Sequence, residues 1–291
     1  MRNLNENTVT DAVLQTISAE TDHRLREVVT SLVKHLHAFA IEVGLRPDEW
    51  MQGIQYLYDA GKMSTPERNE FILTSDILGL SSLIDMIKGR GVGTGTEYSV
   101  LGPFFVEDAP EVSVGGDMAG NNPGVEVVLS GRILDEKGKP VGGARIDLWQ
   151  NQDNGLYDVQ ETHEGAVPNL RCHQITGADG RYGVRTIRPV SYKVPDDGPA
   201  GEILRATGRT AWRPAHYHVW INAKGYRPLV TELFPGDDPH INGDAVFGVR
   251  DSLRVDFSES NDEAEAASYG VKFPYQKVDF DFVLVANQAV E

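Results

Sequence analysis

Two histidines separated by one residue have the clearest potential for chemistry in this chain. His216 and His218 lie in residues 213–220, a run rich in aromatic and β-branched side chains that predicts a β-strand. Side chains alternate between the two faces of a strand, so both imidazoles should point to one face and could bind a single metal ion. The alternative is a partly buried strand with hydrogen-bonded histidines, because His-x-His alone is weak evidence for a metal.

Two tyrosines upstream of the histidines lie in loops at strand ends. Tyr157 follows a predicted strand that ends at Gln150, and Tyr192 lies in a proline-rich loop. An aromatic side chain that covers the end of a β-sandwich explains an isolated loop tyrosine equally simply. Rigid loops at strand ends are, however, where scaffolds commonly place functional side chains. The residues alone leave both interpretations open.

Three segments, in this order along the chain, resemble the intradiol ring-cleaving dioxygenases. The segments are Asn154-Gly155-Leu156-Tyr157, Tyr192-Lys193-Val194-Pro195-Asp196-Asp197-Gly198-Pro199 and Arg213-Pro214-Ala215-His216-Tyr217-His218. The resemblance extends over essentially the whole chain. It implies a non-haem iron(III) enzyme whose Fe(3+) is held by two tyrosinates and two histidines. The matching positions are Tyr157, Tyr192, His216 and His218.

Physical chemistry agrees with this implied ligand set. Iron(III) is a hard cation that anionic phenolate oxygens stabilise, and imidazole nitrogens can complete its set of ligands. Binding to the metal deprotonates the tyrosines although their unperturbed pKa is near 10. The resemblance also implies that Tyr192 leaves the metal when a 1,2-dihydroxybenzene binds and takes up one of its protons. Arg213 would stabilise charge that develops on the ring, and a surface salt bridge is its alternative role.

The segments that would line the substrate pocket resemble a subgroup of the family, the hydroxyquinol 1,2-dioxygenases. Asp76 is the most informative position, because a carboxylate facing the ring could accept a hydrogen bond from a third hydroxyl. A helix-surface or capping aspartate is the alternative. In that subgroup the matching pocket positions are Leu73, Asp76, Val100, Leu101, Gly102, Pro103, Phe104, Val194, Pro195, Arg213 and Val246.

One residue departs from the family's pattern. Glu232 follows the histidine pair on the next predicted strand, at a position where relatives often carry glutamine or histidine. If its side chain lies near the metal, it adds a negative charge that could shift the iron's potential. A solvent-exposed orientation is equally compatible with the sequence.

The expected function is therefore cleavage of hydroxyquinol by O2 to 3-hydroxy-cis,cis-muconate, the enol form of maleylacetate. A catechol or chlorocatechol 1,2-dioxygenase is the main rival, and substrate preference separates the two. A more remote alternative is a metal-free, prealbumin-like binding module, because residues 125–150 have the turn-rich pattern of such domains.

The elements that must position these residues fall into two predicted regions. Residues 1–100 are expected to form a helical dimerisation region, and residues 101–291 an antiparallel β-sandwich catalytic domain with the iron site. Helices are expected to end at Gly44 and Gly61, to start at Pro47, and to run from a cap at Thr65 to Lys88. By resemblance, the helices form a homodimer interface that encloses a phospholipid.

Two predicted hairpins punctuate the sandwich. The first spans residues 176–187 around the turn at 178–180, and the second joins strands at 216–223 and 227–234 through the turn at 224–225. Further strands are expected at residues 125–134, 144–150, 253–257 and 280–285. Short strands separated by turn signals are typical of a sandwich or barrel.

Composition narrows the class of protein further. The chain of 291 residues has a formal net charge of −16, which argues against a nucleic-acid partner. Cys172 is the sole cysteine, so an intrachain disulfide is impossible and a metal must use other ligands. The sequence contains neither a signal-peptide pattern nor an apolar run of about 18 residues. We therefore expect a cytoplasmic protein without a membrane span.

Overall fold

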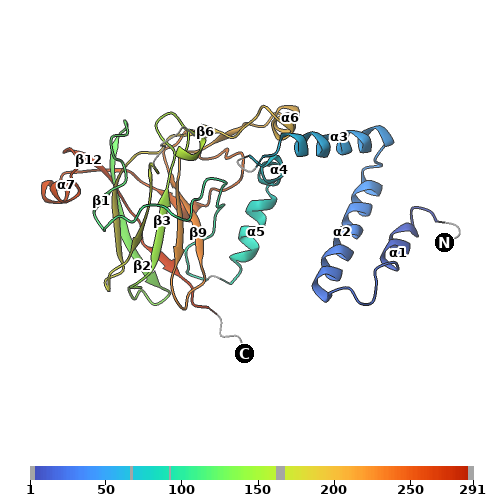
Figure 1. The fold of residues 1–291 in the computed structure, drawn as a ribbon, viewed down its shortest axis with the longest axis horizontal. Coiled ribbons are helices and arrows are strands. Elements are labelled where there is room, and N and C mark those ends of the chain that lie inside the picture. The colour runs from blue at the N-terminus through green and yellow to red at the C-terminus, as the bar shows by residue number, and fades with distance from the viewer. Residues whose placement is uncertain (1–3, 66–67, 92, 162–167, 288–291) are drawn as a thin grey trace. The chain divides into compact units, whose positions relative to one another are not determined.

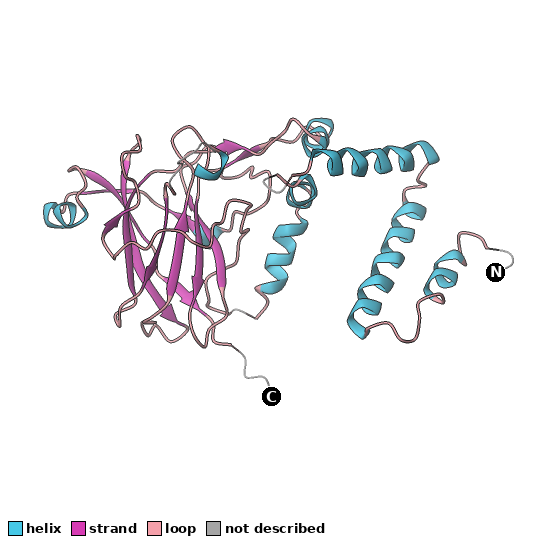
Figure 2. Ribbon diagram, in the orientation of Figure 1, coloured by secondary structure: helices cyan, strands magenta, loops and turns pink. Residues whose placement is uncertain are grey.

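The structure is a computed structural model that describes residues 4–65, 68–91, 93–161 and 168–287. The chain divides into two compact units, Met1–Lys62 and Met63–Glu291. Among the described residues, the first unit is helical, and the second contains the strands together with the remaining helices (Figures 1 and 2). Among the described residues, no helix combines the length and apolar character needed to cross a membrane.

The first unit confirms most of the predicted helix boundaries. Asp22 caps the second helix, since its carboxylate accepts a hydrogen bond from the backbone N–H of Leu25 at 2.9 Å. Pro47 is the first residue of the third helix, as expected, but Gly61 does not end it, because the helix continues through its last turn to Met63. A glycine near a helix end costs only about 1 kcal/mol, which the turn tolerates. The helices of this region are α1 (Val9–Leu14), α2 (His23–Glu42) and α3 (Pro47–Met63).

The helix predicted to run to Lys88 is wrong in two respects. It starts later, because Asn69 rather than Thr65 caps it by accepting from two backbone N–H groups, and Pro66 lies outside the described residues. It is also broken at Gly79, whose φ of 74° cannot continue a right-handed helix. The resulting helices are α4 (Glu70–Ile77) and α5 (Leu80–Lys88); the later ones are α6 (Pro199–Ala206) and α7 (Glu263–Tyr269).

Two main sheets form the rest of the second unit. The five-stranded sheet has the order β10-β9-β8-β3-β4, and the six-stranded sheet has β1-β5-β2-β12-β11 with β13 also paired to β2. A short ribbon joins β6 to β7. The strands are β1 (Gly116–Asp117), β2 (Glu126–Asp135), β3 (Arg145–Trp149), β4 (Arg171–Ile175), β5 (Arg181–Ile187), β6 (Tyr192–Lys193), β7 (Trp212–Arg213), β8 (Tyr217–Asn222), β9 (Leu229–Pro235), β10 (Arg254–Val255), β11 (Ser258–Ser260), β12 (Tyr275–Asp279) and β13 (Phe282–Leu284).

The two sheets bury a shared apolar core, which confirms the predicted sandwich. Leu129 of β2 and Val184 of β5 lie in one core cluster with Leu148 of β3 and with Val219 and Ile221 of β8. The central pairs are antiparallel, whereas β1 pairs in parallel with β5, β10 with β9, and both β12 and β13 with β2. The main core therefore lies against the inner face of the five-stranded sheet, and the outer face of this sheet points away from that core.

One predicted hairpin is confirmed and the other is wrong. β8 and β9 pair antiparallel across the expected turn. The turn at residues 177–180 instead joins β4 of the five-stranded sheet to β5 of the six-stranded sheet. A turn sequence shows where the chain reverses, but the burial of both flanking strands decides which neighbours they pair with.

Candidate metal and substrate site

The two histidines lie as the strand pattern predicted. Tyr217 and Val219 enter the main core, so His218 points to the outer face of the five-stranded sheet. His216 directly precedes β8, and its Nε2 lies 3.1 Å from Nε2 of His218. Both side chains are buried. The two Nε2 atoms therefore lie close together in a buried site.

Strand register builds the surroundings of His218. Trp149 of β3 and Glu232 of β9 are its direct cross-strand partners on either side. The Trp149 and His218 rings are stacked, with centroids 4.8 Å apart and planes 4° from parallel. Gly102 lies close to the imidazole, since a Cβ there would approach His218 Cε1 to 3.1 Å. These contacts fix the plane of the ring.

Tyr157 completes the cluster from the loop after β3. Its side chain is fully buried, its hydroxyl lies 3.1 Å from His216 Nε2, and its ring stacks on Phe104 at 4.4 Å. The loop is held by a buried ion pair between Asp158 and Arg171. Arg171 also donates a hydrogen bond to the carbonyl of Phe104. The guanidinium of Arg171 therefore links the loop that carries Tyr157 to the segment that contains Phe104.

Tyr192 reaches the cluster from the β6–β7 ribbon. It pairs directly with Arg213 of β7, which places both residues beside the histidines. The Tyr192 ring centroid is 5.7 Å from that of His216 and 5.9 Å from that of Tyr157. Unlike Tyr157, Tyr192 is only partly buried. All four residues predicted to hold iron are therefore within one cluster.

The donor atoms have the chemistry and spacing of ligands to one ion. His216 Nδ1 lies 2.9 Å from the carbonyl oxygen of Pro214, to which its N–H donates, so Nε2 is the unprotonated nitrogen and its lone pair can bind a metal. Burial, with a contribution from Arg213, lowers the pKa of His216 to about 3 and keeps the ring neutral. Neighbouring ligands about 2.0–2.1 Å from a metal lie roughly 3 Å apart, which matches the 3.1 Å separations to Tyr157 and His218.

The tyrosines do not ionise in the field of the protein alone. Burial raises the pKa of Tyr157 well above its usual value, and Tyr192 adds to the shift. Burial also raises the pKa of Tyr192, although the positive charge of Arg213 opposes this. A bound cation would supply the charge that two phenolates need. The site therefore fits a metal of high positive charge.

Arg213 is held between two buried carboxylates. Its Nη2 donates to Glu232 Oε1 at 3.0 Å, and its Nε donates to Asp244 Oδ1 at 3.1 Å. Burial disfavours the guanidinium, but Asp244 and Glu232 outweigh that cost and raise the pKa of Arg213 well above its usual value. The predicted surface alternative for Arg213 is wrong, because the side chain is buried and lies 3.4 Å from His216.

The structure brings together part of the predicted pocket. Leu73, Val100, Val194 and Val246 belong to one apolar cluster formed by α4, α6 and neighbouring loops. Asp76 is half-buried on α4. Burial raises its pKa above the usual value, although a hydrogen bond from Ser81 and the charge of Arg213 oppose this shift. Three of the other predicted pocket residues are exposed: Leu101, Pro103 and Pro195.

Three residues near the cluster were not singled out from the sequence. Trp149 stacks on His218, Asp244 pairs with Arg213, and Ser99 donates to Glu232 at 2.6 Å. Only Trp149 carried a local signal, as the aromatic end of a predicted strand. The other two reach the site through non-local folding.

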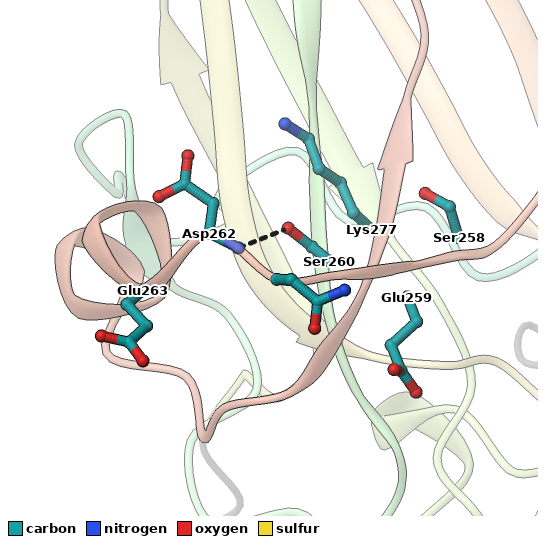
Figure 3. A pocket seen from close by; sticks show the side chains of 7 residues that line it. Ser258, Glu259, Ser260, Asp262, Glu263 and Lys277 are labelled. Atoms are coloured by element: carbon teal, nitrogen blue, oxygen red, sulfur yellow. Dashed lines mark hydrogen bonds between the residues drawn. The ribbon is translucent and has the colours of Figure 1, made fainter.

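A polar surface hollow lies elsewhere, at the β11–β12 edge of the six-stranded sheet (Figure 3). Asp262 and Lys277 contribute to its wall, and the backbone N–H of Asp262 donates to Ser260 Oγ. It shares no residue with the tyrosine–histidine cluster. Its open, polar walls lack the convergent donor atoms of the cluster, so we do not assign the chemistry to it.

The fold and this site define a class of enzyme, and comparison with known proteins agrees. Family models described as "Dioxygenase" and "Catechol dioxygenase N terminus" match residues 100–286 and 22–92. The chain belongs to the intradiol ring-cleaving dioxygenase family. This result confirms the resemblance inferred from the three motifs and argues against the alternative interpretation, a metal-free binding module.

Named relatives refine the comparison. The chain is 45% identical to hydroxyquinol 1,2-dioxygenase of Rhizobium sp. (strain MTP-10005) over 266 residues, 90% of each chain. A solved structure of hydroxyquinol 1,2-dioxygenase from Pseudomonas putida DLL-E4 has a TM-score of 0.89 and 41% identity, covering 97% of this chain and 99% of that one. Catechol 1,2-dioxygenase of Acinetobacter radioresistens has a TM-score of 0.84 and 27% identity, covering 99% and 96%.

Family membership implies a non-haem iron. The described residues contain a cluster of two histidines and a carboxylate, His216, His218 and Glu232, whose ligand atoms all lie within 4.8 Å of one another. This finding supports the predicted metal dependence.

Proposed function

We propose that this chain cleaves hydroxyquinol with O2 to 3-hydroxy-cis,cis-muconate, with Fe(3+) held by Tyr157, Tyr192, His216 and His218. The observation that carries the proposal is the convergence of the Tyr157 hydroxyl and both Nε2 atoms at 3.1 Å separations. The similarity to hydroxyquinol 1,2-dioxygenases over most of the chain supports the substrate. Both atoms of O2 enter the product.

The bound iron would activate the chelated diol toward O2, and the ring would be cleaved between the two carbons that carry the vicinal hydroxyl groups. Tyr192 is the less buried of the two tyrosines, so we assign to it the encounter with the entering diol, in which its phenolate oxygen would accept a proton from a substrate hydroxyl. Arg213 places a fixed positive charge beside His216, where negative charge on the ring is stabilised without reorganisation. Trp149 and Phe104 keep water away from His218 and Tyr157.

Asp76 is proposed to select the third hydroxyl. It shares α4 with Leu73, which packs against the apolar pocket cluster. The positive charge of Arg213 favours the ionised form of its carboxyl group. A carboxylate that accepts a hydrogen bond from hydroxyquinol is left unpaired by catechol, at a cost of about 1–3 kcal/mol. The proposed pocket also includes Val100, Leu101, Gly102, Pro103, Phe104, Val194, Pro195 and Val246.

Oxygen uptake by the iron-loaded protein with equal concentrations of hydroxyquinol and catechol tests this proposal. We expect a preference for hydroxyquinol that falls about tenfold or more in Asp76→Ala, in line with the energy above. Asp85→Ala is the matched control, because Asp85 is another half-buried carboxylate, on α5, whose pKa burial raises to about 6. Its preference should stay at the wild-type value.

Each other outcome has a distinct meaning. A wild-type preference for catechol would keep the iron site but overturn the hydroxyquinol assignment in favour of a catechol 1,2-dioxygenase. An unchanged preference in Asp76→Ala would remove Asp76 from substrate selection. Absence of uptake with either diol, in protein shown to contain iron, would overturn the proposed reaction.

We also propose that residues 1–100 form a homodimerisation region for the catalytic domain at residues 101–291, and that the interface holds a phospholipid. Five apolar side chains along α2 are about half exposed: Leu25, Val28, Leu32, Leu36 and Phe39. Their three- and four-residue spacing forms one stripe, and such stripes mark interaction surfaces. Native mass spectrometry should detect a dimer with an added lipid mass; a lipid-free monomer alone would contradict this.

A further inference from the structure

Glu232 is the residue whose position the sequence left open, and its side chain is fully buried beside the histidines. Its Oε1 lies 3.4 Å from His218 Nδ1 and 3.5 Å from His216 Nε2. It accepts hydrogen bonds from Arg213 Nη2 at 3.0 and 3.2 Å and from the Ser99 hydroxyl at 2.6 Å. These are the bonds of a carboxylate, which accepts on both oxygens.

The backbone prevents this carboxylate from moving away. A Cβ at Gly248 would lie 2.7 Å from Glu232 Oε2 and 2.8 Å from Arg213 Nη2, so the main chain packs directly against the ion pair. The Ser99 hydroxyl lies 2.7 Å from the Gly248 carbonyl and 2.6 Å from Glu232. Glu232 is also fully buried, so bulk solvent does not screen its charge from the histidines.

The charges around Arg213 do not cancel. Glu232 and Asp244 both pair with this single guanidinium, and all three groups are buried. Two carboxylates against one cation leave one uncompensated negative charge. Of the two carboxylates, Glu232 is the one that also contacts the histidines, through its cross-strand position opposite His218.

We propose that Glu232 is a positioning residue that orients Arg213 and places a negative charge behind the iron ligands, favouring iron(III) over iron(II). The inference rests on the proposed iron site. Iron(III) carries one more positive charge than iron(II), so a nearby carboxylate stabilises it more and lowers the potential for its one-electron reduction. Replacing that carboxylate by a neutral amide should raise the potential.

The test compares iron-loaded wild-type protein with Glu232→Gln, in which the side-chain shape and one acceptor oxygen are kept. At a pH above 7, where the Glu232 carboxyl group is ionised, the midpoint potential is measured by redox titration and the tyrosinate-to-iron(III) charge-transfer band by absorption spectroscopy. In Glu232→Gln we expect a higher potential and a band at longer wavelength, because the iron accepts an electron more readily. Ser99→Ala is the control, since it removes the 2.6 Å hydrogen bond to Glu232 and keeps the carboxyl group itself.

The outcomes separate this inference from the iron site itself. An unchanged potential and band in Glu232→Gln would overturn the inference while leaving the site intact, as would equal shifts in Ser99→Ala. A wild-type protein that binds iron without a charge-transfer band would overturn the tyrosinate site. If Glu232→Gln fails to fold by circular dichroism, Glu232→His provides a second replacement of the carboxylate, and the same two results decide.

Discussion

Tyr157→Phe is expected to lose the iron and the red tyrosinate–iron(III) colour. The substitution removes one hydroxyl from a site where that oxygen lies 3.1 Å from His216 Nε2, and a phenyl ring can keep the stack on Phe104. Changes to groups that merely support a metal ligand typically cost 10–100-fold in affinity. Loss of an anionic ligand should therefore lower iron affinity by at least about 100-fold, measured by competition with a chelator.

Tyr182→Phe is the matched control for Tyr157→Phe. Tyr182 is also fully buried, but it lies on β5 in the six-stranded sheet, and its hydroxyl donates to the carbonyl of Phe280. Both variants delete a buried hydroxyl, so they share any general cost in stability. Only Tyr157→Phe should lose colour and iron. A Tyr157→Phe protein with full iron content and an unchanged visible spectrum would rule out Tyr157 as a ligand.

Arg213→Met is expected to lower the free energy of unfolding by about 3–5 kcal/mol, besides its effect on catalysis. Removing one member of a buried ion pair leaves its partner's charge uncompensated, and here two carboxylates, Glu232 and Asp244, depend on the same guanidinium. Burial already raises the pKa of Glu232 to about 7 despite the presence of Arg213. Urea unfolding of the iron-free protein measures the loss.

Two further variants make the Arg213 result interpretable. Arg132→Met removes an exposed partner of Asp281, paired at 2.9 Å, and should cost about 1 kcal/mol or less. Arg213→Met combined with Glu232→Gln should recover part of the lost stability, because one uncompensated charge is then removed. Equal stabilities for wild type and Arg213→Met would show that the buried carboxylates do not depend on this ion pair.

Local patterns were sufficient for some elements of this protein. The alternation of side chains along a strand placed His216 and His218 on one face, and the apolar spacing and Pro47 predicted α2 and α3. The three motifs identified the family and the four residues proposed as iron ligands. Each of these inferences uses neighbours a few residues apart, where backbone geometry sets the arrangement.

Contacts between distant segments decided the rest. The sequence of the turn at 177–180 could not show that β4 and β5 belong to different sheets, because that depends on which core each strand buries. Nor could it show whether Glu232 faces solvent or the histidines. The register of β9 against β8 places Glu232 opposite His218, and the approach of Gly248 encloses it with Arg213. Pairing and enclosure are non-local, so only the tertiary structure determines the charge beside the proposed iron site.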